Sequence, residues 1–117
     1  MANLATMPTT WAALTSKVGT GSDVRIGHNT TATYAPSGNE PAYVIALHGH
    51  SIVRVFASKV AVRHCGWVSV TTFDRIRRFL PAGWSAGFAG GDPHVRNYRT
   101  GERHAVDSSE WVTVRGD

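Results

Sequence analysis

The sequence holds one cysteine, Cys65, and this scarcity excludes an internal disulfide. A lone cysteine is typical of a protein that works in a reducing compartment. No apolar run approaches the roughly 20 residues that a membrane-spanning helix needs. The first residues, MANLATMPTTW, have neither the basic region nor the apolar region of a secretory signal. We therefore expect a cytoplasmic protein without a membrane segment.

The sequence also lacks the motifs that most often carry catalysis. Its eight acidic residues are scattered, with no pair of carboxylates at a recognisable spacing. Gly19-Thr20-Gly21 lacks the Lys-Ser/Thr pair of a phosphate-binding loop, and no G-x-S-x-G is present. A nucleophilic Cys65 would need a base, but adjacent strand residues such as His64 and Cys65 point to opposite faces. We therefore expect no enzyme activity, no catalytic residue and no cofactor, and we interpret Cys65 as a small buried hydrophobe.

Only His48-Gly49-His50 has a spacing that suits metal ligands. Two histidines at positions i and i+2 of a strand share a face, and together with His64 or Cys65 they could chelate a zinc ion. Gly49 favours a turn instead, which would break that shared face. We therefore predict no metal site and retain His48 and His50 only as its candidate ligands.

Positive charge is in excess and is unevenly distributed along the chain. Residues 51–103 contain nine Lys or Arg and three acids, whereas the rest of the chain contains three basic residues and five acids. Ten of the twelve cations are arginine, which can bind phosphate or carboxylate through two parallel hydrogen bonds. A basic half favours a polyanionic partner, and the alternative is a solubilising surface on a small basic protein.

At 117 residues the chain can bury one modest core and therefore forms one domain. We expect residues 1–8 to be loose and residues 9–117 to form an α+β domain. Nine candidate segments predict about six to eight short strands: 24–26, 31–34, 42–48, 52–56, 59–64, 68–70, 84–88, 95–98 and 110–114. They predict a mainly antiparallel, bent sheet with one or two short helices packed on it.

The strands at 52–56 and 59–64 are joined by only Ala57-Ser58, so we expect them to pair as a hairpin. Their alternation assigns apolar side chains to the inner face: Val53, Val55, Val60 and Val62. The same alternation assigns three cations to the outer face: Arg54, Lys59 and Arg63.

The first expected helix lies in TTWAALTSKVG, where Thr9 or Thr10 can cap its start and Gly19 can end it. The second is expected from Thr72 to Leu80, with Thr71 or Thr72 as its cap and Pro81 after its end. Its apolar side is formed by Phe73, Ile76, Phe79 and Leu80.

We expect Asp74, Arg75 and Arg78 on the opposite side of the second helix. Two interpretations of these charges stay open. They match ordinary helix design, because the arginines suit the C-terminal end of the dipole and Asp74 and Arg78 form an i, i+4 pair. Alternatively, Arg75 and Arg78 grip phosphates, which would make binding depend on salt.

The order of several short motifs resembles a known family. Leu47-His48 is followed by Gly66-Trp67, Thr71-Thr72-Phe73-Asp74-Arg75-Ile76 and Leu80-Pro81. This pattern resembles small accessory proteins encoded mostly by phages of actinobacteria, over about residues 17–84, and the tail beyond Pro93 is expected to be distinct. The resemblance implies a phage product that acts in the cytoplasm of its bacterial host, and it carries over no binding residue. It favours a shared structural unit in which Gly66 turns the chain and Trp67 lies in the core.

The leading hypothesis is a non-enzymatic protein that binds nucleic acid through a basic surface. Five cations are the expected phosphate contacts: Arg54, Lys59, Arg63, Arg75 and Arg78. No helix-turn-helix or zinc-finger signature is present, so sequence-specific recognition is not predicted. The alternative is a host-directed protein ligand that modulates a bacterial protein, with Trp11, Trp84 and Trp111 as exposed anchors. Exposed strand edges could also pair copies of the chain into a homo-oligomer.

Overall fold

The computed structural model describes residues 6–116, which form an α+β fold with two α-helices and nine strands in that part of the chain. The helices and strands follow in the order α1 (Trp11–Val18), β1 (Val24–Gly27), β2 (Thr30–Tyr34), β3 (Tyr43–Leu47), β4 (His50–Val55), β5 (Lys59–Val62), α2 (Val70–Phe79), β6 (Trp84–Gly87), β7 (His94–Asn97), β8 (Arg103–Ala105) and β9 (Val112–Arg115). The predicted fold class is confirmed.

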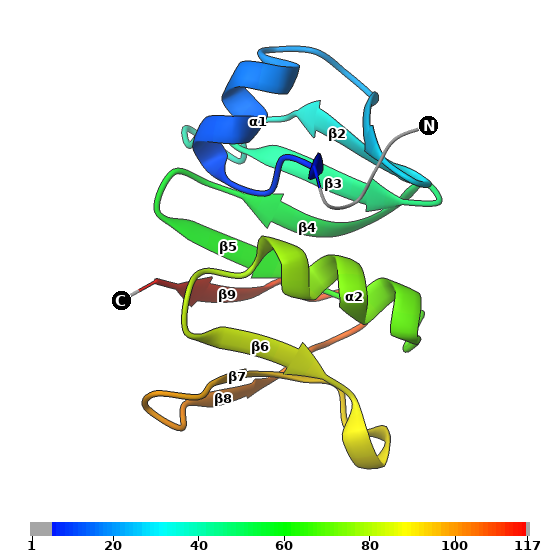
Figure 1. The fold of residues 1–117 in the computed structure, drawn as a ribbon, viewed down its shortest axis with the longest axis vertical. Coiled ribbons are helices and arrows are strands. Elements are labelled where there is room, and N and C mark those ends of the chain that lie inside the picture. The colour runs from blue at the N-terminus through cyan, green and yellow to red at the C-terminus, as the bar shows by residue number, and fades with distance from the viewer. Residues whose placement is uncertain (1–5, 117) are drawn as a thin grey trace.

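The strands form two antiparallel sheets. The larger has the order β1-β2-β3-β4-β5-β9, so a meander of five strands is completed by the last strand of the described chain. The smaller has the order β6-β7-β8. Both helices lie on the same side of the larger sheet, and α2 also contacts β6 of the smaller one (Figure 1). Neither α1 nor α2 lies on the opposite side of the larger sheet (Figure 1).

The first helix matches its prediction closely. The Thr10 Oγ1 accepts a hydrogen bond of 3.1 Å from the Ala13 backbone N–H, which satisfies one of the free donors at the helix start. Gly19 ends the helix with a φ of 61°, a left-handed conformation that favours glycine. Leu14 and Val18 are buried against the sheet, so α1 covers its β2 end.

The second helix seats the predicted apolar residues in the main core. Phe73, Ile76 and Phe79 are each at most 2% exposed, and burying side chains of this size contributes about 1.5–3 kcal/mol each. The predicted hairpin between β4 and β5 is also present, with Val55 opposite Val60. The helix and the hairpin therefore form the centre of the fold.

The start of α2 differs from its prediction. Ser69, rather than Thr71 or Thr72, is the cap, and its Oγ accepts from the Thr72 N–H at 3.2 Å. The helix therefore begins at Val70, and the strand expected at 68–70 is absent from the described chain. A serine followed by β-branched residues suits both a short strand and a capped helix, and the apolar stripe of α2 decides between them.

Two tryptophans were predicted in the wrong environment. Trp84 was expected at the surface, but it is 7% exposed and its Nε1–H donates to the Arg115 carbonyl at 2.8 Å. Trp67 was expected in the core, but it is 55% exposed. The difference arises because β6 turns the Trp84 side chain into the main core, where it reaches β9, whereas Trp67 ends a turn at the rim of the larger sheet.

The N-terminal prediction needs one correction. Residues 1–5 lie outside the described part of the chain, so most of the loose segment predicted at 1–8 has no description. Met7, however, is 6% exposed and belongs to the main core. Packing of the domain therefore begins before Thr9.

Candidate functional site

The uncovered side of the larger sheet gathers cations from four strands and the residue that follows one of them. Arg54 lies opposite Ala61 on β5, and Val44 and Thr113 continue this row on β3 and β9. The alternation that buries the neighbouring valines directs these side chains away from the helices. The same strand register places two exposed arginines on this side, Arg25 on the edge strand β1 and Arg115 on the edge strand β9. We call this set the basic face: Arg25, Arg54, Lys59, Arg63 and Arg115.

Trp111 anchors the centre of the basic face. The guanidinium carbons of Arg54 and Arg63 lie 4.4 and 4.2 Å from the centre of its ring, close enough for cation–π attraction. The ring packs against a small apolar cluster that includes Phe56 and Ala61. Burial and then the charge of Arg63 lower the pKa of Arg54, so the two guanidinium groups share one restricted space.

Backbone and side-chain contacts hold the cations of this face in place. The Arg63 Nε–H donates to the Ser51 carbonyl at 2.8 Å, and its second nitrogen donates to the Ser109 carbonyl at 3.2 Å. Lys59 forms an ion pair of 2.8 Å with Glu40. Among the described residues, Glu40 is the acid that is paired with a cation of this face, so positive charge remains in excess there.

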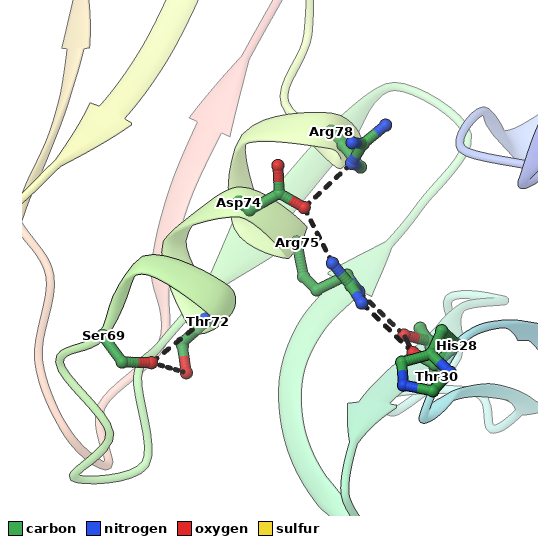
Figure 2. Close-up of polar contacts among 7 residues, drawn as sticks. All are labelled: His28, Thr30, Ser69, Thr72, Asp74, Arg75 and Arg78. Carbon is green, nitrogen blue, oxygen red and sulfur yellow. Dashed lines mark hydrogen bonds and ion pairs between the residues drawn. The ribbon is translucent and has the colours of Figure 1, made fainter. Parts of the chain in front are cut away.

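Arg75 and Arg78 lie on α2, on the other side of the sheet. The expected exposure of Arg75 is wrong, because its side chain is only 5% exposed. Figure 2 shows it reaching from the helix to the turn between β1 and β2. Its Nε–H donates to Thr30 Oγ1 at 3.0 Å, and one terminal nitrogen donates to the His28 carbonyl at 3.2 Å.

The burial of Arg75 has a geometric cause. Arg75 lies one helical turn from both Thr72 and Phe79, at the border of the buried stripe. Because α2 contacts both sheets, the buried side of the helix is wider than the stripe formed by its apolar residues. Arg75 therefore joins α2 to the β1–β2 turn and is not available at the surface.

Asp74 receives hydrogen bonds from both helix arginines. Its Oδ2 accepts from an Arg75 terminal nitrogen at 2.7 Å and from the Arg78 Nε–H at 3.0 Å (Figure 2). Burial opposes ionisation of this carboxyl, but the hydrogen bonds and charges of Arg78 and Arg75 outweigh it and lower its pKa. The predicted i, i+4 pair between Asp74 and Arg78 is confirmed.

The remaining cations are spread over other surfaces. Arg103 is paired with Asp92 on the smaller sheet. Arg77 is exposed on α2, and Arg96 is exposed on β7. The structure therefore brings together Arg54, Lys59 and Arg63 of the predicted phosphate contacts, and it separates Arg75 and Arg78 from them.

The histidine pair flanks a tight turn. His48 and Gly49 form the two-residue connection between β3 and β4, with φ values of 51° and 81°, and Leu47 is paired with His50 across it. Positive φ at both central residues is characteristic of the type I′ hairpin turn. The histidines therefore do not share the face of one strand. No group of three or more His, Cys, Asp or Glu side chains in residues 6–116 could hold a metal ion.

A second turn of the same kind positions Trp67. The Trp67 N–H donates to the His64 carbonyl at 2.8 Å, and Cys65 and Gly66 between them have φ values of 55° and 85°. The Cys65 thiol donates to the Ser51 carbonyl at 3.1 Å, which steadies a non-glycine residue in a left-handed conformation. Trp67 is thus fixed in place while its ring remains exposed.

These two turns and the start of α2 enclose a groove of about 360 Å³, which we call the Trp67 groove. Its apolar walls come from Leu47, Ile52 and Trp67. Its polar lining comes from His48, His50, Ser69, Thr71 and Thr72. Sequence reasoning missed this site because its residues come from two segments, 47–52 and 67–72, that only the fold brings together. The available signal was the pair of left-handed turns at His48-Gly49 and Cys65-Gly66.

In residues 6–116, neither helix is long and apolar enough to cross a membrane. No curated protein and no solved structure matches the sequence. A family model does match, over residues 7–102, and this range extends past the tail boundary that we expected at Pro93. The model describes a phage protein of the Kyanoviridae, which infect cyanobacteria, so the expectation of an actinobacterial phage is not supported. The chain belongs to the family of the Kyanoviridae Gp96 protein.

Proposed function

We propose that this protein is a non-enzymatic phage accessory protein that binds nucleic acid through the basic face and acts inside the infected host cell. The observation that carries the proposal is the set of five cations on the side of the sheet that neither α1 nor α2 covers. Phosphates attract such a surface without requiring sequence-specific contacts. The ordered arginines at Trp111 would bind with little further loss of side-chain freedom.

A salt titration of binding tests this function. The variant Arg25→Gln/Arg115→Gln removes two exposed cations from the edges of the basic face without touching the core. The matched control, Arg77→Gln/Arg96→Gln, removes the same charge from exposed positions elsewhere. Fluorescence anisotropy with a labelled oligonucleotide would give the dependence of the affinity on salt concentration.

Each phosphate contact contributes about 0.7–0.9 to the slope of log affinity against log salt. We therefore expect the first variant to reduce that slope by about 1.4–1.8 and the control to leave it nearly unchanged. Absence of binding at low salt, or equal effects of the two variants, would overturn the proposal.

A second candidate function is that of a host-directed protein ligand. The observation in its favour is a run of exposed apolar side chains at Trp67, Val68 and Val70, which is typical of a protein contact. Isolation of the protein from nuclease-treated host lysate would test it. One partner in fixed stoichiometry, lost when Val70 is replaced by Asp, is the expected result. Recovery that depends on intact nucleic acid would contradict it.

A further inference from the structure

Trp67 combines a fixed backbone position with an exposed ring. The turn from His64 to Trp67 holds its backbone through a 2.8 Å hydrogen bond, yet 55% of the residue is exposed. It therefore contributes little to the core, although exposing so large an apolar surface to water is unfavourable. A rigid, exposed indole beside a groove is suited to stacking against a planar ligand.

The lining of the Trp67 groove combines stacking surface with hydrogen-bonding groups. The His50 ring lies 5.5 Å from the Trp67 ring at a tilt of 44°, so the two rings form one aromatic wall. His48 and Thr71 supply donors and acceptors, and among residues 6–116 no Asp, Glu, Lys or Arg side chain lines the groove. These groups suit a flat, uncharged heterocycle with polar edges.

The groove lies on the helix side of the larger sheet, and a hydrogen bond at the edge of the sheet links the strand that lines it to Arg63 of the basic face. His50 in the groove is followed by Ser51, whose carbonyl accepts hydrogen bonds from the Arg63 Nε–H at 2.8 Å and from the Cys65 thiol at 3.1 Å. Arg63 of the basic face is therefore one residue away from the groove wall. A polymer of phosphates and flat heterocycles that passes round this edge of the sheet could place a heterocycle in the groove and a phosphate at Arg63.

We propose that the Trp67 groove binds an unpaired nucleobase of a single strand whose phosphates lie on the basic face. This inference rests on the proposed nucleic-acid binding and narrows it to single-stranded DNA or RNA. Stacking of bases on aromatic side chains, combined with a positively charged track, is how proteins bind single strands without sequence preference. A base in a duplex is already stacked and paired, so it cannot enter the groove.

An apolar segment of a partner protein is the competing occupant. It would use Val68 and Val70, which are exposed beside Trp67 but do not line the groove. The polar groups that do line it, such as His48 and Thr71, would lose hydrogen bonds to water against an apolar segment. The lining therefore favours the base.

The test compares three labelled probes by anisotropy at low salt: a single strand, the same strand in a duplex, and a single strand with abasic sites. The abasic strand keeps the phosphates and removes the stacking partner. The protein is assayed as wild type and as Trp67→Ala, with Trp67→Phe as the conservative variant. Tyr98→Ala is the matched control, because Tyr98 is also exposed, at 62%, and is absent from the groove lining.

Wild type is expected to bind the intact single strand more tightly than the abasic strand or the duplex. Trp67→Ala should weaken single-strand binding by roughly fivefold to a hundredfold, which is the range for loss of one stacked base. It should leave the affinity for the abasic strand and the salt slope unchanged. Trp67→Phe should restore much of the loss, and Tyr98→Ala should behave as wild type.

The outcomes separate this inference from the proposed function. Equal binding of intact and abasic strands by the wild type would overturn the base site and leave binding at the basic face standing. Binding of neither single strand nor duplex would overturn both. If Trp67→Ala keeps nucleic-acid affinity but loses a host protein that the wild type retains, the groove is a protein-docking site. Equal affinity of the wild type for the intact and abasic strands overturns the inference even if a variant fails to fold.

Discussion

Replacement of Arg75 by Met tests whether this arginine is a structural connection. The substitution keeps an unbranched side chain of similar length and removes the guanidinium, which donates to Thr30 Oγ1, the His28 carbonyl and Asp74. Thr30 is fully buried, so water cannot replace the lost donor at that end. The other end is less costly, because Asp74 remains partly exposed and keeps its bond to Arg78.

The size of the expected effect follows from these contacts. Hydrogen bonds to charged groups contribute about 1.5–3 kcal/mol each, and breaking a buried ion pair costs about 3–5 kcal/mol. Because Asp74 keeps a partner and Thr30 Oγ1 still donates to the His28 carbonyl, we expect a loss of about 2–4 kcal/mol. For a chain of this size, that corresponds to a fall in Tm of roughly 8–16 °C.

Thermal and urea unfolding followed by circular dichroism would measure the loss. Arg77→Met is the control, since it removes an exposed arginine two residues away and should change stability by no more than about 0.5 kcal/mol. Equal stability of the two variants would refute the reasoning. A stable Arg75→Met protein with a weaker salt dependence of nucleic-acid binding would show instead that Arg75 reaches phosphate.

Three further predictions concern the turn before α2, its cap and its acid. Gly66→Ala should cost about 1–2 kcal/mol in urea unfolding, because Gly66 has a φ of 85°; a neutral result would mean that the turn rearranges. Ser69→Ala should cost about 1 kcal/mol through loss of the cap, whereas Thr71→Ala, two residues further along in the first turn of the helix, should not. The pKa of Asp74 is lowered from its ordinary 3.8, so its stabilising effect is complete above about pH 4 and is lost as the pH falls through the lowered pKa. Asp74→Asn should therefore flatten the dependence of Tm on pH below pH 4, and an unchanged dependence would contradict this assignment.

Local sequence patterns were sufficient to predict the helices and strands whose formation depends on nearby residues alone. The β4–β5 hairpin was predicted because its valines alternate and its expected connection, Ala57-Ser58, is short. The first helix was predicted because Thr10 and Gly19 mark its ends with side-chain chemistry that acts locally. β8 was not predicted, because its three residues show no alternation and it is recruited only by pairing with β7.

Side chains that are buried by contacts between separate helices and strands could not be predicted from the pattern of one helix or strand alone. A helical projection places Arg75 away from the apolar stripe, and only the contact of α2 with both sheets brings it under cover. Trp84 is likewise covered by packing that joins it to the Arg115 carbonyl, 31 positions along the chain. The candidate site was therefore predicted only in part. Strand alternation correctly placed Arg54, Lys59 and Arg63 on one face of the sheet, whereas the packing of α2 against distant elements buries Arg75 and takes it out of the site.

The segment from Gly66 to Pro81 was interpreted as a structural unit, and most of its residues fit that interpretation. Ser69 caps the helix, Phe73 and Ile76 fill the core, and Arg75 joins the helix to a distant turn. Trp67 does not fit, because a residue that served only folding would gain stability from burial, and this one is mostly exposed. A smaller polar residue could end the same turn without exposing apolar surface to water. The rigid part of the segment therefore explains how Trp67 is held, and a ligand in the groove would explain why a tryptophan is held there.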